Sequence, residues 1–276
     1  RYIKKDDLSI VMQYGYRPQS FLLKDIKFEV FPEGTTLESL PKTDIKYIGM
    51  EADAEWRKEA NQRIEAIRKG NFKVQFIKDG IPMSNKDVNI KLVNHAFPFG
   101  AKLDAESVVK NSDDYKNFKK GFNSVVLGND LKIKAWSKER KRAQTLEALS
   151  ILKADEIPVK GHVLVWPGFN YLTKEFRANK DNPEKLVQLM ETHVSSILDA
   201  TQGQVTHWDV VNEAYTNRDL QKITGSEDIL YNAFKTVAKK QPKVRRFTNE
   251  YGIISKGGID TQKQQWYYDY IKRLDE

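Results

Sequence analysis

The segment Trp208-Asp209-Val210-Val211-Asn212-Glu213-Ala214 is an apolar, β-branched run that ends in an adjacent amide and carboxylate. Such a run predicts a buried β-strand, and side-chain alternation puts Asp209 and Glu213 on one face and Asn212 on the other. Where the backbone leaves the strand, Asn212 and Glu213 can both reach one pocket. In an α/β barrel this carboxyl end of the strands is the active-site face. Taken alone, the segment equally fits a surface Asn-Glu pair after a buried strand.

The composition allows a sizeable folded protein and limits its partners. The 276 residues, 39% of them hydrophobic, suffice for one large or two modest domains. The formal net charge of +8 raises nucleic acid as a partner, but the basic residues are spread over predicted helical faces, so we do not expect nucleic-acid binding. No apolar run approaches the ~20 residues that a bilayer requires, so no membrane association is expected either.

Metal and cofactor chemistry is not indicated. The chain has no cysteine, which excludes disulfides and thiolate metal sites. The four histidines, His95, His162, His193 and His207, lack the spacing of metal ligands. We therefore expect neither a metal nor an organic cofactor.

Residues 1–47 predict the remnant of a β-sandwich, which would be a candidate for carbohydrate binding. Short β-like runs at residues 8–14 and 20–31 are followed by the turn-rich segment Pro32-Glu33-Gly34-Thr35. The preceding strands of such a sandwich are missing, so we expect the chain to be a piece of a longer protein.

Residues 48–95 predict a connector made of a helix and a β-hairpin. Apolar residues recur at intervals of three and four over residues 53–69, with Trp56 as the expected packing anchor. Two strands are expected at residues 72–77 and 87–93, separated by a turn that contains Asp79-Gly80.

Residues 96–276 alternate strand and helix, which favours parallel βα units. We expect strands at residues 97–103, 122–127, 159–166, 205–212 and 244–248, and helices at residues 113–120, 137–154, 183–201, 226–241 and from 261 onward. A doubly wound sheet fits this count, but no Gly-rich phosphate loop follows the first strand, so a (β/α)8 TIM barrel of the α/β class is favoured. A complete barrel needs ~250 residues. We therefore expect about five βα units here, a sheet open on one side, and the remaining strands beyond Glu276.

Polar side chains follow four consecutive predicted strands. They are Asn129 and Lys132, then His162 and Trp166, then Asn212 and Glu213, and finally Asn249 and Glu250. Each has an ordinary structural explanation, such as a surface lysine, a hydrogen-bonded core histidine or a core tryptophan. Their coincidence at successive strand ends favours a shared site. A tryptophan face, amides, a lysine and a carboxylate suit a polyhydroxylated neutral ligand better than a phosphate or a hydride cofactor.

Five segments in this order resemble glycoside hydrolase family 10, the endo-β-1,4-xylanases. They are residues 97–101 (FPFGA), 122–132, 161–166 (GHVLVW), 208–214 and 249–251 (NEY), and the resemblance covers roughly residues 50–276. It implies a TIM barrel that acts as an endo-acting, retaining hydrolase of β-1,4-xylan in plant cell walls. It also implies a secreted or periplasmic protein that needs no cofactor. Oligomeric state is left open.

The resemblance also implies roles for individual residues. Glu213 matches the acid/base glutamate, and Asn212 matches the amide that binds a sugar hydroxyl. The residues that match those holding the sugars on the non-reducing side are Asn129, Lys132, His162 and Trp166. Asn249 matches a site-lining amide, and Glu250 and Tyr251 are possible site-lining residues. The nucleophile of the family ends the seventh strand, so we expect it beyond this chain and expect the chain alone to be inactive.

Three departures from the family pattern leave strict xylan specificity open. Gly128 stands where glutamate is usual, Pro167 where a polar residue is frequent, and Glu250 where aspartate is common. A β-glucanase of similar fold and a non-catalytic carbohydrate-binding or inhibitor-like barrel are the alternatives. Without the family, Glu213 and Glu250 would be paired as the two catalytic carboxylates, a pairing that we do not favour. Burial and a nearby carboxylate are expected to raise the pKa of Glu213.

Overall fold

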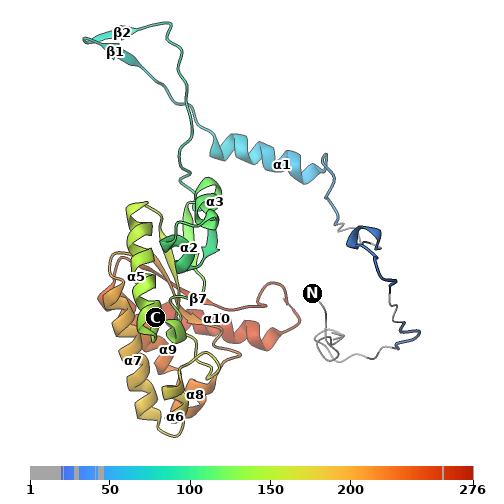
Figure 1. The fold of residues 1–276 in the computed structure, drawn as a ribbon, viewed down its shortest axis with the longest axis vertical. Helices are drawn as coiled ribbons and strands as arrows, with labels where there is room; N and C mark the ends of the chain where they lie inside the picture. The colour runs from blue at the N-terminus through green and yellow to red at the C-terminus, as the bar shows by residue number, and fades with distance from the viewer. Residues whose placement is uncertain are drawn as a thin grey trace. The chain divides into compact units, whose positions relative to one another are not determined.

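The computed structural model describes residues 20, 22–27, 31–40, 42, 47–256 and 258–275 (Figure 1). Its described residues fall into two units, one within residues 19–91 and one within residues 92–276. The second unit holds the predicted βα units and all the candidate site residues.

The first unit contains little regular structure. It consists of the 3-10 turn η1 (Leu37–Ser39), helix α1 (Glu55–Arg63) with its π-helical extension η2 (Ile64–Arg68), and the antiparallel strands β1 (Phe76–Lys78) and β2 (Ile81–Met83). The predicted helix is therefore confirmed, but it buries no side chain of its own. Trp56 is 46% exposed, and its Nε1 donates a hydrogen bond to the carbonyl of Gly49 at 2.6 Å. It ties the helix to the preceding turn rather than to a core.

The predicted hairpin forms, but the strands that pair in it are not the ones that were expected. Asp79 and Gly80 both have positive φ, at 51° and 79°, which is the backbone of a tight two-residue hairpin turn. This turn pairs residues 76–78 directly with 81–83. Residues 87–93 form no strand, and their apolar side chains are exposed.

The predicted sandwich remnant stays a prediction. The strand expected at residues 8–14 lies outside the described residues, and those described within 20–31 form no strand.

The second unit is built on a five-stranded parallel sheet. Its strands are β3 (Gly100–Leu103), β4 (Ser124–Leu127), β5 (Val159–Val165), β6 (His207–Asn212) and β7 (Arg245–Asn249), and their order in space follows their order in the sequence. This sequential parallel order is that of consecutive strands in a (β/α)8 barrel. The predicted five-stranded sheet is confirmed. Within the described residues, the outer edges of β3 and β7 pair with no further strand.

The helices alternate with these strands (Figure 1). They are α2 (Ala105–Val109), α3 (Asp113–Gly121), α4 (Ile133–Trp136), α5 (Glu139–Ala154), α6 (Lys174–Ala178), α7 (Pro183–Ala200), α8 (Asp219–Thr224), α9 (Asp228–Lys240) and α10 (Thr261–Asp275). The five longer helices were predicted to within two residues at each boundary that the prediction specified. The sequence prediction missed α2, α4, α6 and α8, because four to six residues are too few to establish a helical period.

Strand β3 begins at Gly100, three residues later than predicted, because the Asn123 side chain binds the backbone of the residues before it. The Asn123 amide accepts a hydrogen bond from the backbone N–H of Phe99 at 2.7 Å, and it donates to the carbonyl oxygens of His95 at 2.7 Å and Phe97 at 3.2 Å. These bonds fix residues 95–99 as an irregular segment ahead of β3.

One face of the sheet belongs to the core formed with the helices. Trp208 is fully buried on this face. A Cβ atom on Gly161 of the neighbouring strand would lie 2.3 Å from the Trp208 ring, so only glycine fits beside the indole. Helices α7 and α9 pack against each other and against β5, and α9 also packs against β6.

The alternating positions give the opposite face a polar character. Lys160 and His162 of β5 lie beside Asp209 of β6, and His207 contacts the ring of Phe247 on β7 with centroids 5.8 Å apart. In a closed barrel this face lines the interior. It leads toward the carboxyl ends of the strands, where the candidate site lies.

Candidate active site

Apart from His162, which lies within β5, the sequence-predicted site residues lie at or just beyond the carboxyl end of a strand, or in the loop that follows it. Asn212 and Asn249 are the last residues of β6 and β7, and Glu213 and Glu250 follow them directly. Because the strands are parallel, these ends share one edge of the sheet. The predicted placement of both glutamates on this rim is confirmed.

Glu213 has an unusual backbone conformation where β6 ends. Its φ is 52°, which is uncommon for a residue with a Cβ atom. Its N–H donates to the carbonyl of Asn249 at 2.7 Å, and its own carbonyl accepts from the Asn217 side chain at 3.1 Å. These two bonds hold the residue in a left-handed conformation that costs on the order of 1–3 kcal/mol.

The two amides are joined to each other. Asn249 Nδ2 donates to Asn212 Oδ1 at 2.8 Å. Asn212 is buried, whereas Asn249 is exposed. The bond occupies the Asn212 Oδ1 acceptor, and within the described residues Asn212 Nδ2 donates to no protein group.

His162 is held by a carboxylate from the neighbouring strand. Its Nδ1 lies 2.8 Å from Oδ2 of Asp209, whose Oδ1 lies 2.9 Å from Lys160 Nζ. Burial pushes the pKa of Asp209 upward, but the hydrogen bonds from His162 and Lys160 outweigh it and keep the pKa below its usual value. The ionised Asp209 thus orients the imidazole.

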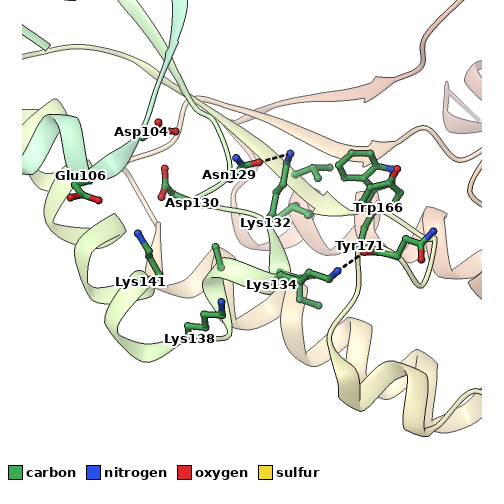
Figure 2. Close-up of a pocket in the computed structure, with 15 residues that line it drawn as sticks. Asp104, Glu106, Asn129, Asp130, Lys132, Lys134, Lys138, Lys141, Trp166 and Tyr171 are labelled. Atoms are coloured by element: carbon green, nitrogen blue, oxygen red, sulfur yellow. Dashed lines mark hydrogen bonds between the residues drawn. The ribbon is translucent and has the colours of Figure 1, made fainter. Parts of the chain in front are cut away.

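Lys132, Asn129 and Trp166 form one polar and aromatic group (Figure 2). Lys132 Nζ donates to Asn129 Oδ1 at 2.9 Å and lies 5.0 Å from the centroid of the Trp166 ring. Tyr171 stacks on Trp166 with centroids 3.5 Å apart and an angle of 5° between the rings. Burial lowers the pKa of Lys132, and Lys102 lowers it further, against the attraction of Glu213.

This group opens into a cavity of about 670 Å³. Its walls come from the segments after β3 and β4, from β5 and from the segment after β5, and Figure 2 shows the lining side chains. Of the predicted site residues, Asn129, Lys132 and Trp166 line the cavity. His162, Asn212, Glu213 and Asn249 do not line it. Hydrogen bonds join Asn249 to Asn212 and to Glu213, and the charge of His162 acts on Glu213, so these four residues form a second cluster.

Glu250 is a buried structural carboxylate rather than an open lining residue. Its side chain is 1% exposed and lies 2.8 Å from Lys263 Nζ. Its two oxygens also accept from the backbone N–H groups of Tyr251 at 3.1 Å and Tyr215 at 3.2 Å. These bonds argue against the alternative in which Glu250 serves as the second catalytic carboxylate. Tyr251 is 46% exposed and its hydroxyl lies 3.1 Å from Thr216 Oγ1.

The pKa of Glu213 is raised, as the sequence predicted. Burial is the largest cause, followed by the charge of Glu250. The positive charges of Lys263, His162 and Lys132 act in the opposite direction without cancelling the rise. A carboxyl with a raised pKa holds its proton closer to neutral pH and is suited to donate it.

Sequence reasoning missed four residues that shape the site. They are Lys160, Asp209, Tyr171 and Lys263, which hold or stack on predicted residues. Asp209 was placed on the same strand face as Glu213, but its partner could be identified only from the register that pairs it with His162. Lys263 lies on a helix 50 residues after Glu213, and no local sequence signal connects the two.

The described part of the chain contains no group of three or more His, Asp or Glu side chains placed to hold a metal ion. Among the same residues, no helix combines the length and the apolar character needed to cross a membrane.

Comparison with known proteins identifies one family. The model described as glycosyl hydrolase family 10 matches residues 89–276. Endo-1,4-beta-xylanase 1 of Arabidopsis thaliana is 26% identical over 224 residues, which cover 79% of this chain and 23% of the relative. Endo-1,4-beta-xylanase A of a Caldicellulosiruptor species is 28% identical over 183 residues, which cover 59% of this chain and 26% of the relative.

Solved structures agree with this match. Xylanase 10B from Thermotoga petrophila, crystallised with xylobiose, superposes with a TM-score of 0.53 and 26% identity over 64% of this chain and 55% of that one. The chain therefore spans about a quarter of the length of these curated relatives and about half of that solved structure.

Proposed function

Because the chain belongs to glycosyl hydrolase family 10, we propose that it supplies the acid/base half of an endo-acting, retaining hydrolase of β-1,4-xylan. The observation that carries the proposal is Glu213, a carboxyl with a raised pKa at the end of β6. The same rim carries amides, a histidine and a stacked tryptophan, which are groups that bind sugars.

In the proposed mechanism, Glu213 protonates the glycosidic oxygen of the departing sugar. The Glu213 carboxylate that results then takes a proton from the water that completes hydrolysis. Its raised pKa favours the first step because more of the acid form is present near neutral pH.

The remaining residues of the rim would hold the sugar. Trp166 offers an aromatic surface backed by Tyr171, while Lys132 and Asn129 supply polar groups at the cavity. His162, oriented by Asp209, and Asn212, oriented by Asn249, would bind hydroxyl groups next to the cleaved bond. Asn249 would line the site beside them, and Tyr251 would border it.

A retaining mechanism requires a second carboxylate about 5 Å from the acid/base. Among the described residues, the carboxylate whose charge acts on Glu213 is Glu250. Its oxygens already bind Lys263 and two backbone N–H groups, so it is not available for attack. We assign the nucleophile to none of the described residues.

Gly128 makes one part of the cavity rim differ from the family pattern. A Cβ atom at this position would lie 2.0 Å from Lys102 Cε, so the lysine stem occupies the space where a side chain would begin. The Lys102 ammonium lies 3.3 Å from Asp104. A lysine therefore stands near the place where a glutamate would accept hydrogen bonds from a distal sugar. We propose mixed-linkage glucan as a second substrate to test.

A second candidate function is binding of β-1,4-linked polysaccharide without cleavage. The observation that favours it is the lack, among the described residues, of an unengaged carboxylate beside Glu213. A polysaccharide substrate would be met outside the cell, so we also propose secretion or a periplasmic location.

The test is hydrolysis of xylan and of mixed-linkage β-glucan by the full-length protein that carries this chain. The proposal predicts shortening of xylan from internal bonds and initial products of β configuration, both visible by proton NMR. Saturable binding of xylo-oligosaccharides without any shortening would favour the second candidate instead. Cleavage of glucan alone would retain the mechanism and change the substrate.

A further inference from the structure

Helix α10 inserts a buried lysine behind the candidate acid/base. Lys263 lies in the first turn of α10, where its backbone N–H bonds to Asp260 Oδ1 at 3.1 Å. Its side chain is only 4% exposed, and its Nζ lies 2.8 Å from Glu250 and 3.5 Å from the centroid of the Tyr251 ring. Lysine is almost never buried to this extent without a dedicated partner.

The carboxylate that Lys263 binds is tied to the Glu213 turn. Glu250 Oε2 accepts from the backbone N–H of Tyr215, two residues after Glu213. The residue before Glu250, Asn249, accepts from the N–H of Glu213 itself at 2.7 Å. Lys263 is therefore linked to the turn that carries the proposed acid/base by its ionic contact with Glu250, by the bond from the Tyr215 N–H to the Glu250 carboxylate, and by the backbone bond between Glu213 and Asn249.

Both charges of the Lys263–Glu250 pair also change the pKa of Glu213. Glu250 raises the pKa of Glu213 and Lys263 lowers it. The other charged groups that act on Glu213 are His162 from β5, itself held by Asp209, and Lys132 from the segment after β4. Of these charges, Lys263 is the one supplied by a helix that follows the last described strand.

We propose that Lys263 is a positioning residue, which holds the Glu250 side chain in place against the turn behind Glu213. Helix α10 thereby controls both the position and the proton affinity of the acid/base. A carboxylate buried without a cation binds a proton, and a protonated Glu250 is a weaker acceptor for the Tyr215 N–H. This inference rests on the proposed role of Glu213 and deepens it.

The test is a pH titration of the Glu213 and Glu250 carboxyl carbons by NMR in the 276-residue chain. Removal of the Lys263 charge in Lys263→Met should make at least one of the two carboxyls titrate about one pH unit or more higher. Lys263→Arg, which keeps the charge, should remain close to the wild type. Lys272→Met, on the exposed part of the same helix, is the matched control and should change neither titration.

If Lys263→Met does not fold, the double variant Lys263→Met with Glu250→Gln replaces the ion pair with neutral side chains of similar size. Because Glu250 influences Glu213 more strongly than Lys263 does, Glu213 should then titrate at a lower pH than in the wild type. Titrations unchanged within about 0.3 pH units in the variant that folds would overturn the inference. Since proton binding and not hydrolysis is measured, that result would leave the proposed xylan hydrolysis standing.

Discussion

His162 on β5 and Asp209 on β6 are joined across neighbouring strands, with Nδ1 and Oδ2 2.8 Å apart. The strand register places the two residues opposite each other. Asp209 also binds Lys160 at 2.9 Å, so one buried carboxylate orients a proposed sugar-binding residue and neutralises a lysine on the inner face of the sheet.

Asp209→Asn should destabilise the protein at neutral pH by about 1–3 kcal/mol, because Lys160 and His162 lose a charged acceptor. The folded protein holds the pKa of Asp209 below its usual value. Its contribution is therefore present above the unfolded pKa near ~3.9 and is lost as the pH falls through the folded pKa. Urea unfolding at pH 7 and pH 3 measures this, and the difference between variant and wild type should shrink at pH 3.

The matched control is Asp199→Asn. Asp199 pairs with Lys240 at 2.7 Å, but its side chain is 63% exposed, so the loss should stay below about 1 kcal/mol. An equal difference between Asp209→Asn and wild type at both pH values would contradict the assigned charge of Asp209.

Glu213→Gln should raise the melting temperature at pH 7. The pKa of Glu213 is higher in the folded protein than in the unfolded chain. The protonated side chain therefore stabilises the fold below the unfolded pKa, and this stabilisation is lost as the pH rises through the folded pKa. The gain from the neutral amide should therefore disappear near pH 3. Glu250→Gln should act in the opposite direction at pH 7, since it removes the partner of buried Lys263. Lower melting of Glu213→Gln at pH 7 would argue against the raised pKa.

Gly161→Ala should cost about 1–3 kcal/mol of unfolding free energy, because overpacking a core displaces its neighbours. The added Cβ would lie 2.3 Å from the fully buried Trp208 ring. Gly121→Ala is the control, since nothing lies within 4 Å of the Cβ that it adds. Chemical denaturation compares the two, and equal stabilities would show that the Trp208 ring has room to move.

Trp166→Ala should weaken binding of xylo-oligosaccharides, because the aromatic surface stacked on Tyr171 is lost. Isothermal calorimetry with xylotriose measures the affinity. Trp56→Ala, which removes the bond to Gly49 and the contact with Arg57 in the other unit, should leave the affinity unchanged. Reduced sugar affinity in the Trp56 variant would contradict its assignment to structure.

The sequence predicted the parallel sheet and the longer helices well because their periodic apolar patterns are local. The β6 strand, with Trp208 and Val210 buried on one face and Asp209 on the other, follows directly from alternation. The hairpin was misplaced because the Asp79-Gly80 turn, rather than the apolar runs, fixed its register. The short helices carry too few residues for a period to appear.

The site was predicted in part for a similar reason. Residues at strand ends, such as Glu213 and Asn249, are found by counting along the chain. Partners such as Asp209 for His162 and Lys263 for Glu250 depend on strand register and on the docking of a distant helix. These partners decide which carboxylate is free to act, and that distinction required three-dimensional contacts.

The most direct test of the account is the turnover of Glu213→Ala in the full-length protein on xylan and on an aryl xyloside with a good leaving group. Loss of a general acid should lower turnover on xylan by about two to four orders of magnitude. Formation of the glycosyl-enzyme from the activated substrate should suffer much less, because its leaving group needs little protonation. Equal losses on both substrates in this step would contradict the role of Glu213 as the acid/base.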